Sequence, residues 1–75
     1  MKIGIIFAIE EELNAFKNLI KIDNEYKIFD LTFYECNIND IDCVLVQCGV
    51  GKVNAARTTQ ILIDNMKVEY IFNVG

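Results

Sequence analysis

Residues 2–20 decide the fold, and they read KIGIIFAIEEELNAFKNLI. The first part, Lys2 to Ile9, is a near-continuous apolar run, which is typical of a strand buried on both faces of a sheet. From Glu10 to about Ile20, apolar side chains recur at helical spacing. A buried strand followed at once by a helix indicates an α/β fold.

The rest of the chain continues this alternation. Further strands are predicted at Tyr26–Phe29, Leu31–Ile38, Ile41–Cys48 and Glu69–Val74, with a second helix from Lys52 to about Met66. Asn39-Asp40 is a turn signal that closes a hairpin, and Gly49-Val50-Gly51 interrupts the apolar pattern. The predicted order is β-α-β-β-β-α-β, with a mixed or mainly parallel central sheet.

Three of these strands are apolar on both sides, so both faces of their sheet need cover. Two helices suffice for roughly one face. The sequence stops at Asn73-Val74-Gly75, at the carboxyl end of a buried strand, where the ligand-binding loops of open α/β sheets begin. We therefore expect residues 1–75 to be the N-terminal fragment of a single α/β domain.

Composition excludes several classes of protein. The 75 residues are 53% hydrophobic and include no proline, which is too apolar for a disordered chain. No apolar run approaches the roughly 20 residues of a membrane span, and the start reads as a strand and not as a signal peptide. The net charge of −4 and the lack of a Lys/Arg cluster argue against nucleic acid or a membrane as a partner.

The chain has three cysteines, Cys36, Cys43 and Cys48, and no histidine. The cysteines have no C-x-x-C spacing, so neither a zinc site nor a catalytic Cys–His pair is expected. We expect reduced thiols packed as small apolar side chains in a cytoplasmic protein, with no metal and no cofactor.

The glycine-rich turn fails the tests for known phosphate motifs. In a P-loop, Val46 would have to be glycine and Val53 serine or threonine, and Asn54 stands at the third glycine of a dinucleotide fingerprint. What remains is a strand–Gly-x-Gly–helix turn. Such a turn serves either tight packing between elements or close approach of a ligand to the backbone.

The acidic triplet Glu10-Glu11-Glu12 opens the first predicted helix. At about 100° per residue, Glu10 and Glu11 project to solvent, whereas Glu12 falls inside the apolar stripe. The stripe comprises Leu13, Ala15, Phe16, Leu19 and Ile20. A carboxylate on a core-facing stripe is costly unless it is paired or used. Glu12 is therefore the candidate functional carboxylate.

The same projection assigns faces to the second helix. Its core-facing stripe is predicted to comprise Ala55, Ala56, Thr59, Leu62, Ile63 and Met66. Arg57, Ile61, Asp64 and Asn65 are predicted to face outwards.

Three motifs carry a resemblance to a known family. Met1–Ile6 followed by Ala8 and Glu10–Glu12 is similar to the opening of the 5′-methylthioadenosine/S-adenosylhomocysteine nucleosidases. The run 49–56, GVGKVNAA, resembles their Gly-(Ile/Val)-Gly-Lys-Val-x-Ala-Ala turn, and 71–75, IFNVG, resembles the strand before their Gly-Ser-Ala-Gly loop. Phe7 and Ile9 depart from the glycine and methionine common there, which puts the pocket shape and substrate preference in question.

The resemblance implies a nucleoside phosphorylase-like three-layer α/β fold, a homodimer, and an enzyme that releases adenine from nucleoside thioethers. Glu12 matches the carboxylate that activates the attacking water. Ala8 and Ile9 match positions lining the nucleoside pocket, and Val50 matches an apolar contact to the alkylthio group. In this family the general acid is an aspartate, which would lie after Gly75, so the fragment alone is expected to be inactive.

Other functions stay open at this point. A purine or uridine phosphorylase or a futalosine hydrolase shares the fold, although phosphorylases need basic residues around phosphate, and Glu12 favours water as the nucleophile. A non-enzymatic truncated α/β module is the alternative from a different class.

Overall fold

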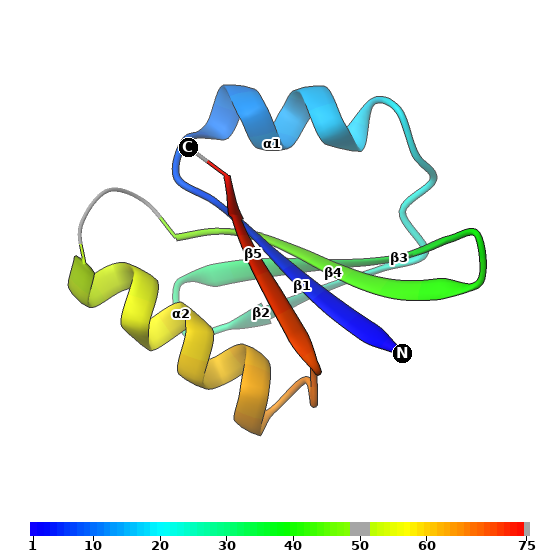
Figure 1. Ribbon diagram of the computed structural model, residues 1–75. Coiled ribbons are helices and arrows are strands. Elements are labelled where there is room, and N and C mark those ends of the chain that lie inside the picture. The colour runs from blue at the N-terminus through cyan, green and yellow to red at the C-terminus, as the bar shows by residue number, and fades with distance from the viewer. Residues whose placement is uncertain (49–51, 75) are drawn as a thin grey trace.

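The computed structural model describes residues 1–48 and 52–74 (Figure 1). Its elements are β1 (Lys2–Phe7), α1 (Glu10–Lys17), β2 (Asn24–Ile28), β3 (Leu31–Ile38), β4 (Ile41–Gln47), α2 (Lys52–Asp64) and β5 (Tyr70–Val74). The predicted order β-α-β-β-β-α-β is confirmed. In the described part of the chain, neither helix is long and apolar enough to cross a membrane.

The five strands form one mixed sheet in the order β2-β3-β4-β1-β5. Strand β1 runs parallel to both of its neighbours, so that Ile3 pairs with Cys43 of β4 and with Tyr70 of β5. Strand β3 is antiparallel to both of its neighbours, β2 and β4, and two hairpins join the three strands. The α/β class and the mixed sheet are confirmed.

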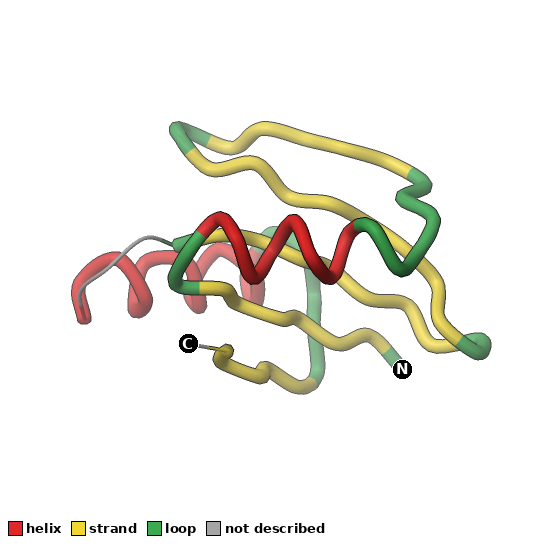
Figure 2. The backbone as a smooth tube through the Cα atoms, turned by 90° about the horizontal axis from the view of Figure 1, so that it is seen from above, coloured by secondary structure: helices red, strands yellow, loops and turns green. Residues whose placement is uncertain are grey.

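The helices lie on opposite faces of this sheet, giving three layers (Figures 1 and 2). Each face therefore has one helix from residues 1–75, and not the full cover that the apolar strands require. The connection from β1 to β4 and the one from β4 to β5 run in opposite directions along the sheet. Because crossovers between parallel strands are right-handed, opposite directions place their helices on opposite faces.

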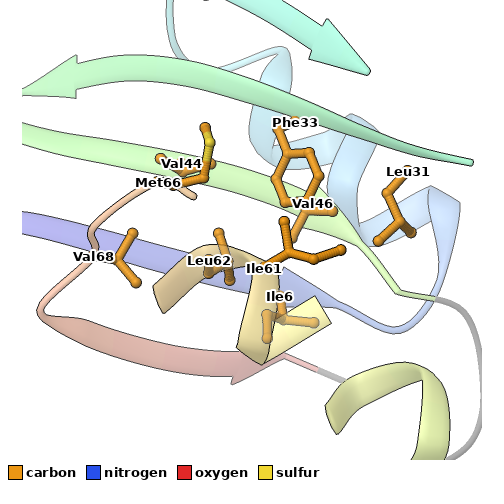
Figure 3. Packing of buried hydrophobic residues seen from close by; sticks show 9 residues of the cluster. All are labelled: Ile6, Leu31, Phe33, Val44, Val46, Ile61, Leu62, Met66 and Val68. Carbon is orange, nitrogen blue, oxygen red and sulfur yellow. The ribbon is translucent and has the colours of Figure 1, made fainter. Parts of the chain in front are cut away.

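Each face has its own hydrophobic core. The α2 side holds Ile6, Leu31, Phe33, Val44, Val46, Ile61, Leu62, Met66 and Val68 (Figure 3). The α1 side holds Phe7, Leu13, Cys36, Cys43 and Leu45. Neighbouring residues of β4 alternate between the two cores, which explains why the sequence of this strand is apolar throughout.

Both hairpins close with two-residue turns. In the predicted turn, Asn39 and Asp40 have φ of 50° and 68°, as type I′ turns require, and the turn is confirmed. The other turn is Phe29-Asp30, where Phe29 has φ 57°. The prediction of Phe29 as a strand residue is therefore wrong, and β2 instead begins two residues earlier than predicted, at Asn24.

Two predicted helix faces need correction. In α1, which ends at Lys17, Ala15 and Leu19 are exposed, and Leu13 is the buried residue. In α2 the buried residues include Thr58 and Ile61, whereas Ile63 is 46% exposed. Arg57, Asp64 and Asn65 are exposed, as predicted.

The reason for the shift in α2 is local. The Thr58 hydroxyl donates a hydrogen bond of 2.8 Å to the Asn54 carbonyl within the helix. A threonine whose hydroxyl is satisfied in this way can be buried without losing a partner. The buried face is therefore centred on Thr58, Ile61 and Leu62. The sequence prediction missed this face because the polarity of a threonine side chain does not reveal that it can face the sheet.

Candidate functional site

The carboxyl ends of β1, β4 and β5 meet at one edge of the sheet. The Ala8 amide donates to the Val74 carbonyl at 3.1 Å, and the Cys48 amide donates to the Phe7 carbonyl at 3.0 Å. From this edge, β1 leads to α1 on one face and β4 leads towards α2 on the other (Figure 1). In open α/β sheets, the point where the crossover direction reverses is the usual ligand-binding crevice.

Ala8 and Ile9 lie at this edge, between the end of β1 and the start of α1. Ala8 is half-buried, whereas Ile9 is 41% exposed. Ile9 is the N-cap residue of α1, with extended backbone (φ −128°, ψ 152°) and no capping side chain. Both residues therefore lie at the edge of the sheet where the resemblance implies a nucleoside pocket.

The acidic triplet forms the first turn of α1. Glu10 and Glu11 are exposed, whereas Glu12 is half-buried, so the structure separates Glu12 from its neighbours as the projection predicted. Glu12 lies at the border of the buried face and not within it, because the adjacent Leu13 takes the core-facing position. Among the described residues, no hydrogen bond or ion pair engages the Glu12 carboxylate.

Phe7 belongs to the core beneath α1. Its side chain is 2% exposed, and its ring centroid lies 5.7 Å from that of Phe16 of α1. Phe7 departs from the glycine common in the resembling family, and the pocket shape was therefore in question at this position. Instead, the ring fixes α1 over the sheet, which positions Glu12 one turn before Phe16.

Val50, the remaining predicted site residue, lies outside the described residues, as does the whole Gly49-Val50-Gly51 turn. The sequence reasoning did not anticipate Val74, whose carbonyl holds the Ala8 amide at the same edge. The strand order could have indicated this contact, because a last strand that pairs in parallel with β1 ends beside Ala8.

Two cavities lie away from this edge. One, of about 250 Å³, is near the amino ends of β1 and β4, and the other, of about 400 Å³, is between β2, β3 and the end of α2. Both include Lys2 and Glu35, which form an ion pair at 3.5 Å. The Tyr26 hydroxyl also donates to Glu35, and this hydrogen bond raises the pKa of Tyr26.

The chain is similar in sequence and in structure to nucleosidases and to a related hydrolase. The chain is 40% identical over all of its 75 residues to the 5′-methylthioadenosine/S-adenosylhomocysteine nucleosidase of an Exiguobacterium species, and covers 32% of that protein. The structure matches S-adenosylhomocysteine nucleosidase from Streptococcus pyogenes, solved with 5-methylthiotubericidin, with a TM-score of 0.93 and 40% identity, over 100% of this chain and 32% of that one. It also matches futalosine hydrolase of Helicobacter pylori, with a TM-score of 0.91 and 25% identity, over 100% of this chain and 33% of that one.

The chain thus spans about a third of the length of the curated relatives it matches, and its resemblance to the nucleosidases is confirmed. The model of the phosphorylase superfamily matches residues 2–75. With the three-layer fold and the mixed sheet in place, the chain belongs to the phosphorylase superfamily.

Proposed function

We propose that this chain is the N-terminal part of an enzyme that hydrolyses the N-ribosidic bond of 5′-methylthioadenosine and S-adenosylhomocysteine and releases adenine. The observation that carries the proposal is the position of Glu12. Within the acidic triplet this carboxylate alone is half-buried, beside the edge where β1, β4 and β5 end. Similarity to nucleosidases at about 40% identity over the whole chain supports the same reaction.

In the proposed mechanism, Glu12 is the general base that takes a proton from the attacking water. Ala8 and Ile9, at the same edge, line the nucleoside pocket, and Val50 contacts the alkylthio group. Hydrolysis with inversion needs one group that activates water and a second that protonates the leaving group. Glu12 supplies the first role, and an aspartate outside residues 1–75 supplies the second.

The test substitutes the three glutamates in turn in the full-length enzyme. Glu12→Gln keeps the size of the side chain but removes the base, so kcat should fall by about 10²–10⁴-fold with little change in substrate affinity. Glu10→Gln and Glu11→Gln are matched controls, because they make the same chemical change on the same helical turn at exposed positions. Adenine release from methylthioadenosine is the measurement.

Equal, modest losses at all three positions would show that the triplet is only a charged helix start. The 75-residue chain alone should release no adenine, because it has a base without an acid. Turnover by this chain would contradict the proposed division of the catalytic groups.

Futalosine hydrolysis is the second candidate, favoured by the structural match to that enzyme. Its lower sequence identity, 25% against 40%, places it behind the nucleosidase proposal. Release of the nucleobase from futalosine, at a higher kcat/KM than adenine release from methylthioadenosine, would reverse this order.

We further propose that the enzyme acts as a homodimer in the cytoplasm and takes part in methionine salvage. Tyr70 and Phe72 of β5 are each 56% exposed in residues 1–75, which span about a third of the length of the relatives, so the rest of the enzyme or a second subunit can cover them. Large exposed apolar side chains that are neighbours on one strand are typical of surfaces covered by further protein.

A further inference from the structure

Cys36 and Cys43 are directly opposite each other in the antiparallel pair β3–β4. The turn Asn39-Asp40 fixes this register, since Ile38 pairs with Ile41. Opposed residues in an antiparallel pair have Cα atoms about 4.5–5.5 Å apart, which is within the range that disulfides span. A bond between the two sulfur atoms therefore needs no shift of strand register.

The two side chains point to the same face of the sheet, into the same core. Both are thiols, 3% and 5% exposed, in the core beneath α1. The Cys43 thiol donates a hydrogen bond of 3.7 Å to the Ile41 carbonyl. Burial raises the pKa of Cys36 to about 11, the larger of the two upward shifts, so Cys43 is the better nucleophile of the two.

The 250 Å³ cavity is lined in part by both cysteines. It is lined by Lys2, Asp23, Asn24, Glu35, Cys36, Asp42 and Cys43. Lys2 pairs with Glu35, so that Asp23 and Asp42 leave an excess of negative charge around the entrance. A small cationic molecule is favoured there over an anionic one.

We propose that Cys36 and Cys43 are a reversible dithiol–disulfide couple that reacts with small aliphatic disulfides, preferably cationic ones. The Cys43 thiolate attacks one sulfur of the disulfide RSSR, forms a Cys43–SR mixed disulfide and expels one thiolate, which takes up a proton. Cys36 then attacks the Cys43 sulfur, forms the Cys36–Cys43 bond and expels the second thiolate. Overall, two protein thiols are oxidised and RSSR is reduced to two RSH.

The product should be readily reduced. Opposed Cβ atoms in an antiparallel pair are about 4.5–5.5 Å apart, whereas disulfides prefer about 3.8 Å. Closing this gap strains the bond, and strained disulfides are the labile ones. The reaction should also be slow at neutral pH, because burial raises the pKa of Cys36 to about 11 and raises that of Cys43 as well.

The experiment treats the folded full-length protein with cystamine, a cationic disulfide, and with dithiodiglycolate, its anionic counterpart. Cleavage before Asp40 and Asp42 under non-reducing conditions separates the two cysteines unless a disulfide joins them. Mass spectrometry should find this link, at a rate that rises about tenfold per pH unit between pH 7 and 9. Cystamine should react faster at low ionic strength, and the difference should shrink in salt.

Three variants sharpen the result. Cys48→Ser is the matched control and should form the link at the wild-type rate. Cys36→Ala should stop at the mixed disulfide on Cys43, and Cys43→Ala should be modified more slowly, at Cys36. Circular dichroism establishes that each variant is folded. If a variant does not fold, the mass-spectrometric search for the Cys36–Cys43 link in the wild-type protein still tests the proposal.

Two outcomes would overturn the proposal. In the first, cystamine leaves Cys36 and Cys43 as thiols until urea unfolds the protein. In the second, the wild-type reaction ends at a mixed disulfide or at a link to Cys48. A Cys36–Cys43 link that a monothiol reductant reverses supports it.

Discussion

Gly4 is predicted to be intolerant of even one added methyl group. It is buried in β1 and faces Leu62 of α2, the central residue of the core in Figure 3. A Cβ placed on Gly4 would lie 3.0 Å from one Leu62 methyl carbon and 3.5 Å from the other. Because Leu62 is 0% exposed, its side chain must move within a packed interior to accept Gly4→Ala.

The size of the effect follows from two opposing terms. Overpacking a core costs about 1–3 kcal/mol, whereas replacing glycine lowers the entropy of the unfolded chain and returns about 0.4–1 kcal/mol. Gly4→Ala should therefore destabilise the fold by up to about 2.5 kcal/mol. Leu62→Ala should cost about 2–5 kcal/mol by leaving a cavity. In the double variant the added methyl group enters the space that Leu62 vacates, so the two costs should not add.

The assay is urea unfolding, followed by circular dichroism, of the wild type, both single variants and the double variant. The free energy of unfolding of the double variant should exceed the additive expectation by about 1 kcal/mol, within the range for residues in contact. Additivity to within about 0.5 kcal/mol would refute the contact between Gly4 and Leu62. A Gly4→Ala variant more stable than the wild type would refute the overpacking argument.

Two further predictions test the corrected faces and turns. Ile61→Ala should lower the free energy of unfolding by about 2–5 kcal/mol and Ile63→Ala by less than about 1 kcal/mol, since Ile61 is 7% and Ile63 46% exposed; urea unfolding with the reverse ranking would restore the face predicted from sequence. Phe29→Gly should stabilise the fold by about 1 kcal/mol, because φ 57° is strained for a bulky residue and the ring is 82% exposed; a lower melting temperature for Phe29→Gly would show that the ring makes contacts that outweigh the strain.

Much of the candidate site was accessible from sequence. Glu12 stood out by its position on the helix, and the structure keeps it apart from Glu10 and Glu11 by burial. The sequence could not show that Glu12 lies at the border of the buried face, because the angle at which α1 meets the sheet depends on Phe7 and Phe16. The roles of Glu12, Ala8, Ile9 and Val50 stay predictions.

The pairing of Cys36 with Cys43 could have been predicted from the sequence, but a search for cysteine motifs misses it. A search for C-x-x-C spacing finds nothing, because Cys36 and Cys43 are separated by six residues. A two-residue turn at Asn39-Asp40 nevertheless makes positions equidistant from it partners, and these two cysteines are such positions. The information lies in the combination of turn and register and not in a motif.

The sequence by itself determined the order of elements, the largely buried strands β1 and β4 and the Asn39-Asp40 turn, because periodicity and turn chemistry are local properties of the chain. The prediction that the last strand is buried is wrong for residues 1–75, because β5 is mostly exposed. Only the tertiary structure decided that α1 and α2 lie on opposite faces, that Thr58 and Ile61 are buried, and that Gly4 must be small beneath Leu62. These features depend on the direction of each crossover and on which side chains meet across layers. Residues such as Gly4 and Leu62 are far apart in the chain, and packing alone brings them together.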